Sequence, residues 1–192
     1  MEQKTRLTIP AIEIEQSPGR KLYTFPIDGK LLPTIATVSR LKRKDQKLSG
    51  YQRPEVLSHI EEIRRYVESE SPMIPNSIVL AFDPTVSFKP NKETALLSYA
   101  RAGTLSIPYD PTLEDEKKPG FIVDGQQRLA AIRDAHVEHF PITVTAFVTD
   151  DVDEQTEQFM LVNSAKPLPK SLIYELLPST QTRLPSFLER RK

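Results

Sequence analysis

Apolar and polar residues alternate in the first part of the chain, which predicts antiparallel strands. Residues 5–15 alternate around leucine and isoleucine, and residues 16–20 contain the proline and glycine of a turn. Residues 21–27 are the predicted hairpin partner, and residues 32–39 form a further predicted strand. The chain therefore begins with a sheet built on a hairpin.

The pattern changes to a three- and four-residue spacing after Pro54. Proline suits the first helical position, because its missing N–H would have no partner there. Apolar residues then recur at helical spacing: Val56, Leu57, Ile60, Ile63 and Val67. This spacing predicts an amphipathic helix that lies on a core, with His59 beside the apolar stripe at the surface.

The remainder mixes short apolar runs with amphipathic segments. The predicted buried or half-buried strands are residues 78–82, 121–123 and 142–148. A hairpin is predicted from residues 96–100 to residues 104–107, with its turn at residues 101–103. The predicted helices are residues 129–137, 154–163, 170–177 and 185–190. Because no βαβ unit repeats, the fold class is α+β, a mixed sheet of short strands with packed helices.

Composition narrows the class of protein. With 192 residues, 38% hydrophobic and 27% charged, the chain has the composition of an ordinary globular domain. Cysteine is absent, which excludes disulfides and thiolate metal sites and fits a cytoplasmic location. No apolar run approaches the roughly 20 residues of a membrane-spanning helix, so no membrane partner is expected.

Charge is balanced over the whole chain and uneven locally. Basic and acidic residues number 26 each, whereas a dedicated nucleic-acid clamp usually has a basic excess. One basic cluster is the best local candidate for contact with DNA phosphates, and its alternative is a solvated loop. Its cationic residues are Arg40, Lys42, Arg43 and Lys44.

Candidate chemistry concentrates at residues 121–129, where a buried strand leads into a helix that opens at Gln126. Asp124 stands where an N-cap carboxylate belongs, and Gly125 permits a close backbone approach. The amino end of the helix would present unpaired N–H groups and a partial positive charge, which attract phosphate. Arg128 opposes the helix dipole, and a bound anion would explain its presence. The alternative is a capping turn with a solvated arginine.

Residues 124–129 (DGQQRL) closely resemble the signature of the DGQHR-domain family, within the ParB/sulfiredoxin-like superfamily. Residues 50–54 and residues 161–168 resemble the family's upstream and downstream elements. The DndB-like branch is linked to DNA phosphorothioation and the DpdB-like branch, the closer match, to 7-deazaguanine insertion into DNA. Gln127 stands where the family motif has His, so this chain cannot use that His in acid–base chemistry.

The resemblance implies a nucleotide pocket that holds ATP and Mg²⁺ and hydrolyses the nucleotide. Asp124 would hold the loop or a Mg²⁺-bound water, Gln126 or Gln127 would place the attacking water, and Arg128 would bind phosphate. The residues expected to bind the nucleotide are Gly125, Gln126, Arg128, Gln52, Arg53 and Asn163. For Arg53 the structural alternative is a cap on a neighbouring carbonyl. DNA nicking ranks below hydrolysis, because no carboxylate cluster suits a metal.

The resemblance also implies DNA and other subunits of a DNA-modification complex as partners. Two alternatives to an ATP-hydrolysing component stay open. One is a DNA-binding transcriptional regulator without catalysis, and the other is an assembly subunit that uses nucleotide only as a conformational ligand. The expected domain covers residues 1–175, and residues 176–192 form a helical segment that could begin a further region.

Overall fold

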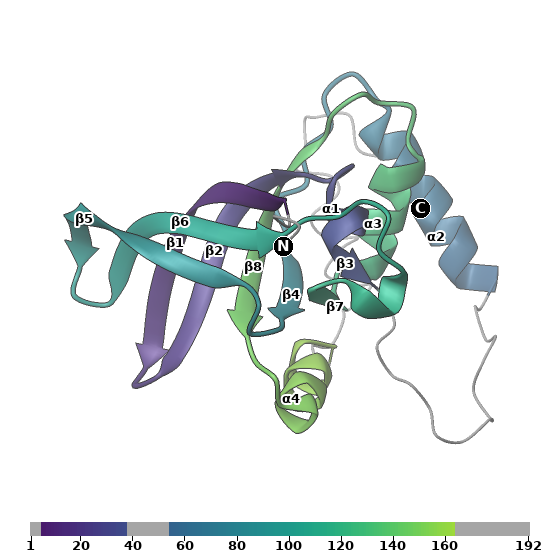
Figure 1. The fold of residues 1–192 in the computed structure, drawn as a ribbon. Helices are drawn as coiled ribbons and strands as arrows, with labels where there is room; N and C mark the ends of the chain where they lie inside the picture. The colour runs from purple at the N-terminus through teal and green to yellow at the C-terminus, as the bar shows by residue number, and fades with distance from the viewer. Residues whose placement is uncertain (1–4, 38–53, 164–192) are drawn as a thin grey trace, which may run out of the picture.

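The computed structural model describes residues 5–37 and 54–163. Eight strands form one curled sheet in the order β3-β7-β4-β8-β2-β1-β6-β5 (Figure 1). The strands are β1 (Arg6–Ser17), β2 (Arg20–Asp28), β3 (Ala36–Thr37), β4 (Ile78–Phe82), β5 (Ser87–Leu97), β6 (Ala100–Pro108), β7 (Gly120–Asp124) and β8 (Pro141–Val148). The helices are α1 (Leu32–Ile35), α2 (Pro54–Val67), the 3₁₀ helix η1 (Asp115–Lys117), α3 (Gln126–Asp134) and α4 (Val152–Asn163). The predicted α+β class is confirmed.

The sheet is mixed. β4 pairs in parallel with β8, and β3 in parallel with β7, whereas the other neighbours are antiparallel. The β1–β2 hairpin lies where the sequence predicts it, and its turn contains Gly19 at a φ of 77°. β1 has 12 residues, close to the strand predicted at residues 5–15, whereas β5, with 11 residues, is longer than the strand predicted at residues 96–100. They belong to the antiparallel half of the sheet, which extends away from the helices in Figure 1.

The main core lies between one face of the sheet and helices α1 and α3. Phe25 and Phe82 are fully buried there, with ring centroids 6.3 Å apart. The alternate residues of β4 and β7, among them Ala81 and Phe121, form a smaller apolar cluster on the opposite face. β4 is therefore buried on both faces, as its wholly apolar sequence predicts.

Two local predictions are wrong. Residues 32–39 do not form one strand, because residues 32–35 fold into α1 and the following strand pairs only through Ala36 and Thr37. The β5–β6 turn lies at residues 98–99 and not at residues 101–103. Gly103 lies inside β6, where a Cβ would come within 2.4 Å of the Lys89 carbonyl oxygen. This glycine allows close strand approach and makes no turn.

The helices agree with the predicted periodicity in part. In α2, Val67 is fully buried and Ile63 partly, but Leu57 is 56% exposed, contrary to the prediction that it faces the core. α3 begins at Gln126 and ends at Asp134, three residues before the predicted end. The predicted helices at residues 170–177 and 185–190 lie outside the described residues. Among the helices that are described, none is both long and apolar enough to cross a membrane.

Candidate functional site

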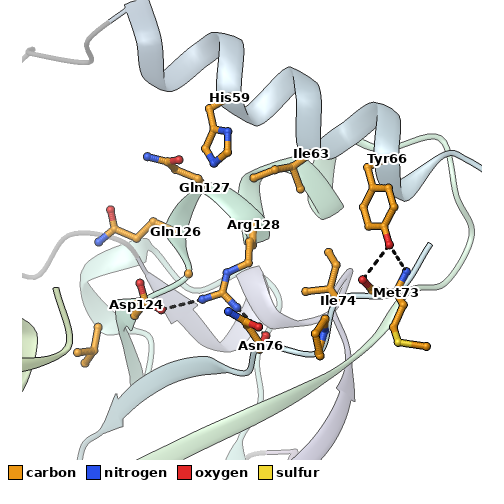
Figure 2. A pocket seen from close by; sticks show the side chains of 13 residues that line it. His59, Ile63, Tyr66, Met73, Ile74, Asn76, Asp124, Gln126, Gln127 and Arg128 are labelled. Atoms are coloured by element: carbon orange, nitrogen blue, oxygen red, sulfur yellow. Dashed lines mark hydrogen bonds and ion pairs between the residues drawn. The ribbon is translucent and has the colours of Figure 1, made fainter. Parts of the chain in front are cut away.

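A pocket of about 470 Å³ opens at the amino end of α3. Its walls come from three segments: the inner side of α2, residues 73–76 before β4, and the junction at residues 123–128 between β7 and α3. Figure 2 shows the side chains of these segments around one opening. The packing of α2 against α3 brings the first wall to the third, although the two are about sixty residues apart in sequence.

Gly125 makes the turn from β7 into α3. It has a φ of 95° and is the N-cap of the helix, in place of the predicted Asp124, and no side chain caps the first turn. A Cβ at this position would lie 2.4 Å from Ile78 Cδ1, so the position excludes any side chain by conformation and by contact. The predicted close backbone approach is confirmed.

The first backbone N–H groups of α3 remain open. The first hydrogen bond that closes this helix runs from the Leu129 N–H to the Gly125 carbonyl oxygen, at 2.9 Å. The N–H groups of Gln126, Gln127 and Arg128 precede it, so they have no acceptor within the helix. Among the described residues, no other acceptor lies within hydrogen-bond distance of them. This end of α3 therefore presents three donors and the positive end of the helix dipole beside the pocket.

Arg128 is tied to the protein itself. Its Nη1 donates to the carbonyl oxygens of Asn76 at 2.6 Å and Ser77 at 3.0 Å, and its Nη2 donates to Asp124 Oδ2 at 2.7 Å. The side chain is only 18% exposed. Within the protein, the carboxylate of Asp124 balances this cation. Three of the five guanidinium N–H groups are thereby engaged in joining α3 to the segment that leads into β4.

The two glutamines of the motif take different positions. Gln126 lies between the pocket and a smaller depression of about 240 Å³ on the β3 side, and its Nε2 makes a long contact of 3.5 Å with the Ile122 carbonyl oxygen. Gln127 lies toward α2, with its amide near the imidazole of His59 (Figure 2). Both therefore line the opening, as predicted.

His59 is exposed, as predicted, and it also lines the pocket. Its imidazole lines the opening, and its Nδ1 lies 3.6 Å from Glu62 Oε2, beyond hydrogen-bond distance. Tyr66, one turn beyond Ile63 on α2, fixes the wall, because its hydroxyl donates to the Met73 carbonyl oxygen and accepts from the Met73 N–H. The sequence carries no signal for these contacts, since they depend on which side of α2 meets α3.

The other predicted site residues cannot be placed. Gln52 and Arg53 lie outside the described residues, and so does the basic cluster at residues 40–44 that is predicted to contact DNA. Asn163 ends α4, and its side chain is outside the described part of the chain. Within residues 5–37 and 54–163, no group of three or more His, Asp or Glu side chains could hold a metal ion.

A comparison with protein families shows the family of the chain. A family model described as DndB, DNA-sulfur modification-associated, matches residues 9–176. The chain belongs to the DndB family. No curated protein and no solved structure matches it significantly. Membership of the DndB family links the chain to DNA-sulfur modification, and the matched range includes every wall of the pocket.

Proposed function

We propose that this DndB-family chain binds ATP through its phosphates at the amino end of α3 and hydrolyses it within a DNA-sulfur modification system. The observation that carries the proposal is the set of three open N–H groups on residues 126–128, beside a pocket that Gly125 keeps free of a side chain. Open N–H groups and the helix dipole together favour an anion, and phosphate is the anion that most often occupies such a position.

The pocket suits a nucleotide in size and lining. Its volume of about 470 Å³ lies within the range of about 300–1,000 Å³ of small-molecule sites. Ile63, Met73 and Ile74 give the wall opposite the helix end an apolar surface, which would accept a base or ribose. The N–H groups of α3 would hold the phosphates, and the Arg128 guanidinium would keep the two walls at a fixed separation.

Mg²⁺ also fits, as an ion held mainly by the nucleotide. Magnesium usually takes one or two protein carboxylates together with substrate phosphates and water. Asp124 is the one carboxylate that lines the described pocket, and Oδ2 already accepts from Arg128, which leaves Oδ1 for this role. The ion would neutralise developing charge on the phosphates, and Gln126 or Gln127 would orient the attacking water.

We also propose that the chain is related to the DpdB-like branch and to the ParB/sulfiredoxin-like superfamily. The likeness of residues 124–129 to the DpdB-like branch and to the ParB/sulfiredoxin-like superfamily supports nucleotide use, with DNA and other subunits as partners. The division of the chain near residue 175 stays a prediction. A DNA-binding regulator without catalysis is the alternative function, and a direct test separates the two.

The test removes one backbone donor and leaves the helix in place. Gln126→Pro deletes the N–H at the first helical position, and Gln126→Ala is the matched control that keeps the N–H. Circular dichroism must show that the helix survives, because a proline strains the preceding Gly125 at its ψ of 15°. We expect ATP binding to weaken about tenfold or more in the proline variant, with turnover lost, and to change little in the alanine variant. Calorimetry, phosphate release and circular dichroism measure affinity, turnover and folding.

Other results of these measurements would favour the alternative functions. Binding without turnover in the wild type would make the nucleotide a conformational ligand. Tight DNA binding by a wild-type chain that does not bind ATP would favour the regulator. Equal affinity of both Gln126 variants, with helical content intact, would remove the helix end from the site.

A further inference from the structure

We infer that His59 is a further binding residue of this site, and that it meets the terminal phosphate of the nucleotide together with Gln127. This inference rests on the proposed function and assigns a role to a side chain outside the DGQQR motif. His59 comes from α2 and lines the same opening as the first turn of α3, and its imidazole lies near Gln127 (Figure 2).

The other titratable side chains that line the pocket already make hydrogen bonds within the protein. Arg128 and Asp124 bind each other, and Arg128 also binds two carbonyl groups of the wall. The Tyr66 hydroxyl uses both its donor and its acceptor capacity on Met73. His59 is the one titratable lining side chain, among the described residues, that has no hydrogen bond to the wall of the pocket. It is therefore available to a ligand.

The charges that line the pocket also point to His59 as a binding residue. The carboxylate of Asp124 and the guanidinium of Arg128 cancel at 2.7 Å, so neither supplies a net charge to the opening. A nucleotide triphosphate carries several negative charges, and the helix dipole offers only about half a positive charge against them. In the described part of the pocket, a protonated His59 adds a positive charge on the α2 side of the opening, with the Glu62 carboxylate 3.6 Å from its Nδ1.

The charged groups around His59 determine how nucleotide binding should depend on pH. Glu62 lies beside it on its own helix, and Asp124 and Arg128 lie across the opening as a neutral pair. Histidine changes charge between about pH 5 and 8. A phosphate next to the imidazole favours its protonated form, so binding should take up a proton and should weaken as the pH rises.

The experiment is ATP titration calorimetry on the 192-residue chain at about pH 6 and about pH 8, with the variants His59→Gln, His59→Lys and His136→Gln. The terminal phosphate also titrates in this range, so the readout is the difference between each variant and the wild type. At low pH we expect His59→Gln to bind about tenfold more weakly, because a charge-assisted hydrogen bond is lost. His59→Lys should bind well at both pH values, since its charge persists, and the exposed His136 should not matter.

The outcomes separate this inference from the proposed function. Wild-type binding that His59→Gln leaves unchanged overturns the role of His59 and leaves the proposed function standing. A lysine variant as weak as the glutamine variant also overturns it, because positive charge would then not be the cause. A wild-type chain that binds no ATP at either pH defeats the proposed function itself and this inference with it.

Discussion

Two turns place a glycine in the left-handed region of the backbone, and their surroundings differ. Gly19 joins β1 to β2 with a φ of 77°, and a Cβ there would meet nothing within 4 Å. Gly125 joins β7 to α3 with a φ of 95°, and a Cβ there would lie 2.4 Å from Ile78 Cδ1 and 3.2 Å from Arg128 Nη2. The same residue type therefore serves chain reversal at one site and close packing beside a pocket at the other.

The comparison shows what marks a turn as a candidate site. The Gly19 turn is stabilised locally, by a 3.0 Å hydrogen bond from its own N–H to Glu15 Oε1. The Gly125 turn is held from a distance, because Arg128 bonds to Asn76 and Ser77, about fifty residues earlier. It also leaves backbone N–H groups open beside a pocket. Crowding, remote support and open donors together indicate a function beyond chain reversal.

The largest expected effect comes from adding one methyl group at each glycine. Gly19→Ala should cost about 1 kcal/mol of unfolding free energy, from backbone strain alone. Gly125→Ala should cost about 3 kcal/mol or more, because the same strain adds to overpacking against Ile78. Urea unfolding of both variants measures the difference, and equal losses would show that the two turns do not differ as described.

The next effect concerns the remote support of the Gly125 turn. Arg128→Ala should lower the unfolding free energy by about 2–3 kcal/mol, since it leaves the partly buried Ser77 carbonyl group, the exposed Asn76 carbonyl group and the Asp124 carboxylate without their donor. Arg133→Ala is the control on the same helix. Arg133 is 59% exposed and pairs, within the described part of the chain, with its neighbour Asp134 alone, so its loss should change stability by about 0.5 kcal/mol or less. If the two variants proved equally stable, Arg128 would not support the turn.

The smallest effect concerns a third turn, at residues 28–30. Side-chain hydrogen bonds stabilise this turn, and it contains no glycine in the left-handed region. Asp28 accepts from the backbone N–H of Lys30 at 3.0 Å and of Phe140 at 3.2 Å, and its Oδ2 lies 2.7 Å from His139 Nδ1. Burial alone would raise the pKa of Asp28, but these hydrogen bonds lower it. The hydrogen bond to Asp28 raises the pKa of His139.

These two shifts set a pH window for stability. The His139 contribution is complete below the pKa of an unfolded histidine, about 6.5, and disappears as pH rises through the raised folded value. The Asp28 contribution holds above the unfolded value of about 3.9 and disappears as pH falls through the lowered folded value. Thermal unfolding should therefore show His139→Gln as less stable than wild type between about pH 4 and 6.5, with little difference above about pH 8. A difference that grows with pH would contradict the assignment.

The sequence predicts the elements that depend on local pattern. The β1–β2 hairpin, α2, the two-faced burial of β4 and the order strand, glycine, helix at residues 121–129 all follow from periodicity and turn residues. The turn predicted at residues 101–103 is wrong because a glycine that permits close strand approach, such as Gly103, has the same sequence signal as one that makes a turn. The start of α1 was missed because four residues are too few to show a helical period.

Only the part of the candidate site that one continuous segment forms could be predicted from the sequence. The motif at residues 124–128 lines a pocket, as expected, but the partners of its arginine are carbonyl groups about fifty residues away, which no local pattern encodes. The position of His59 depends on how α2 crosses α3, and helical periodicity alone does not set that crossing. Long-range packing therefore determines which side chains surround the motif, and the local sequence pattern does not.

The most direct test of the central claim is an amide NMR titration of the ¹⁵N-labelled chain with ATP. We expect the backbone amide resonances of Gln126, Gln127 and Arg128 to move downfield together and to saturate at one affinity, because phosphate oxygens would accept hydrogen bonds from these three N–H groups. Resonances of the Gly19 turn should stay in place. Shifts that occur elsewhere while these three amides remain unmoved would contradict a phosphate site at the amino end of α3.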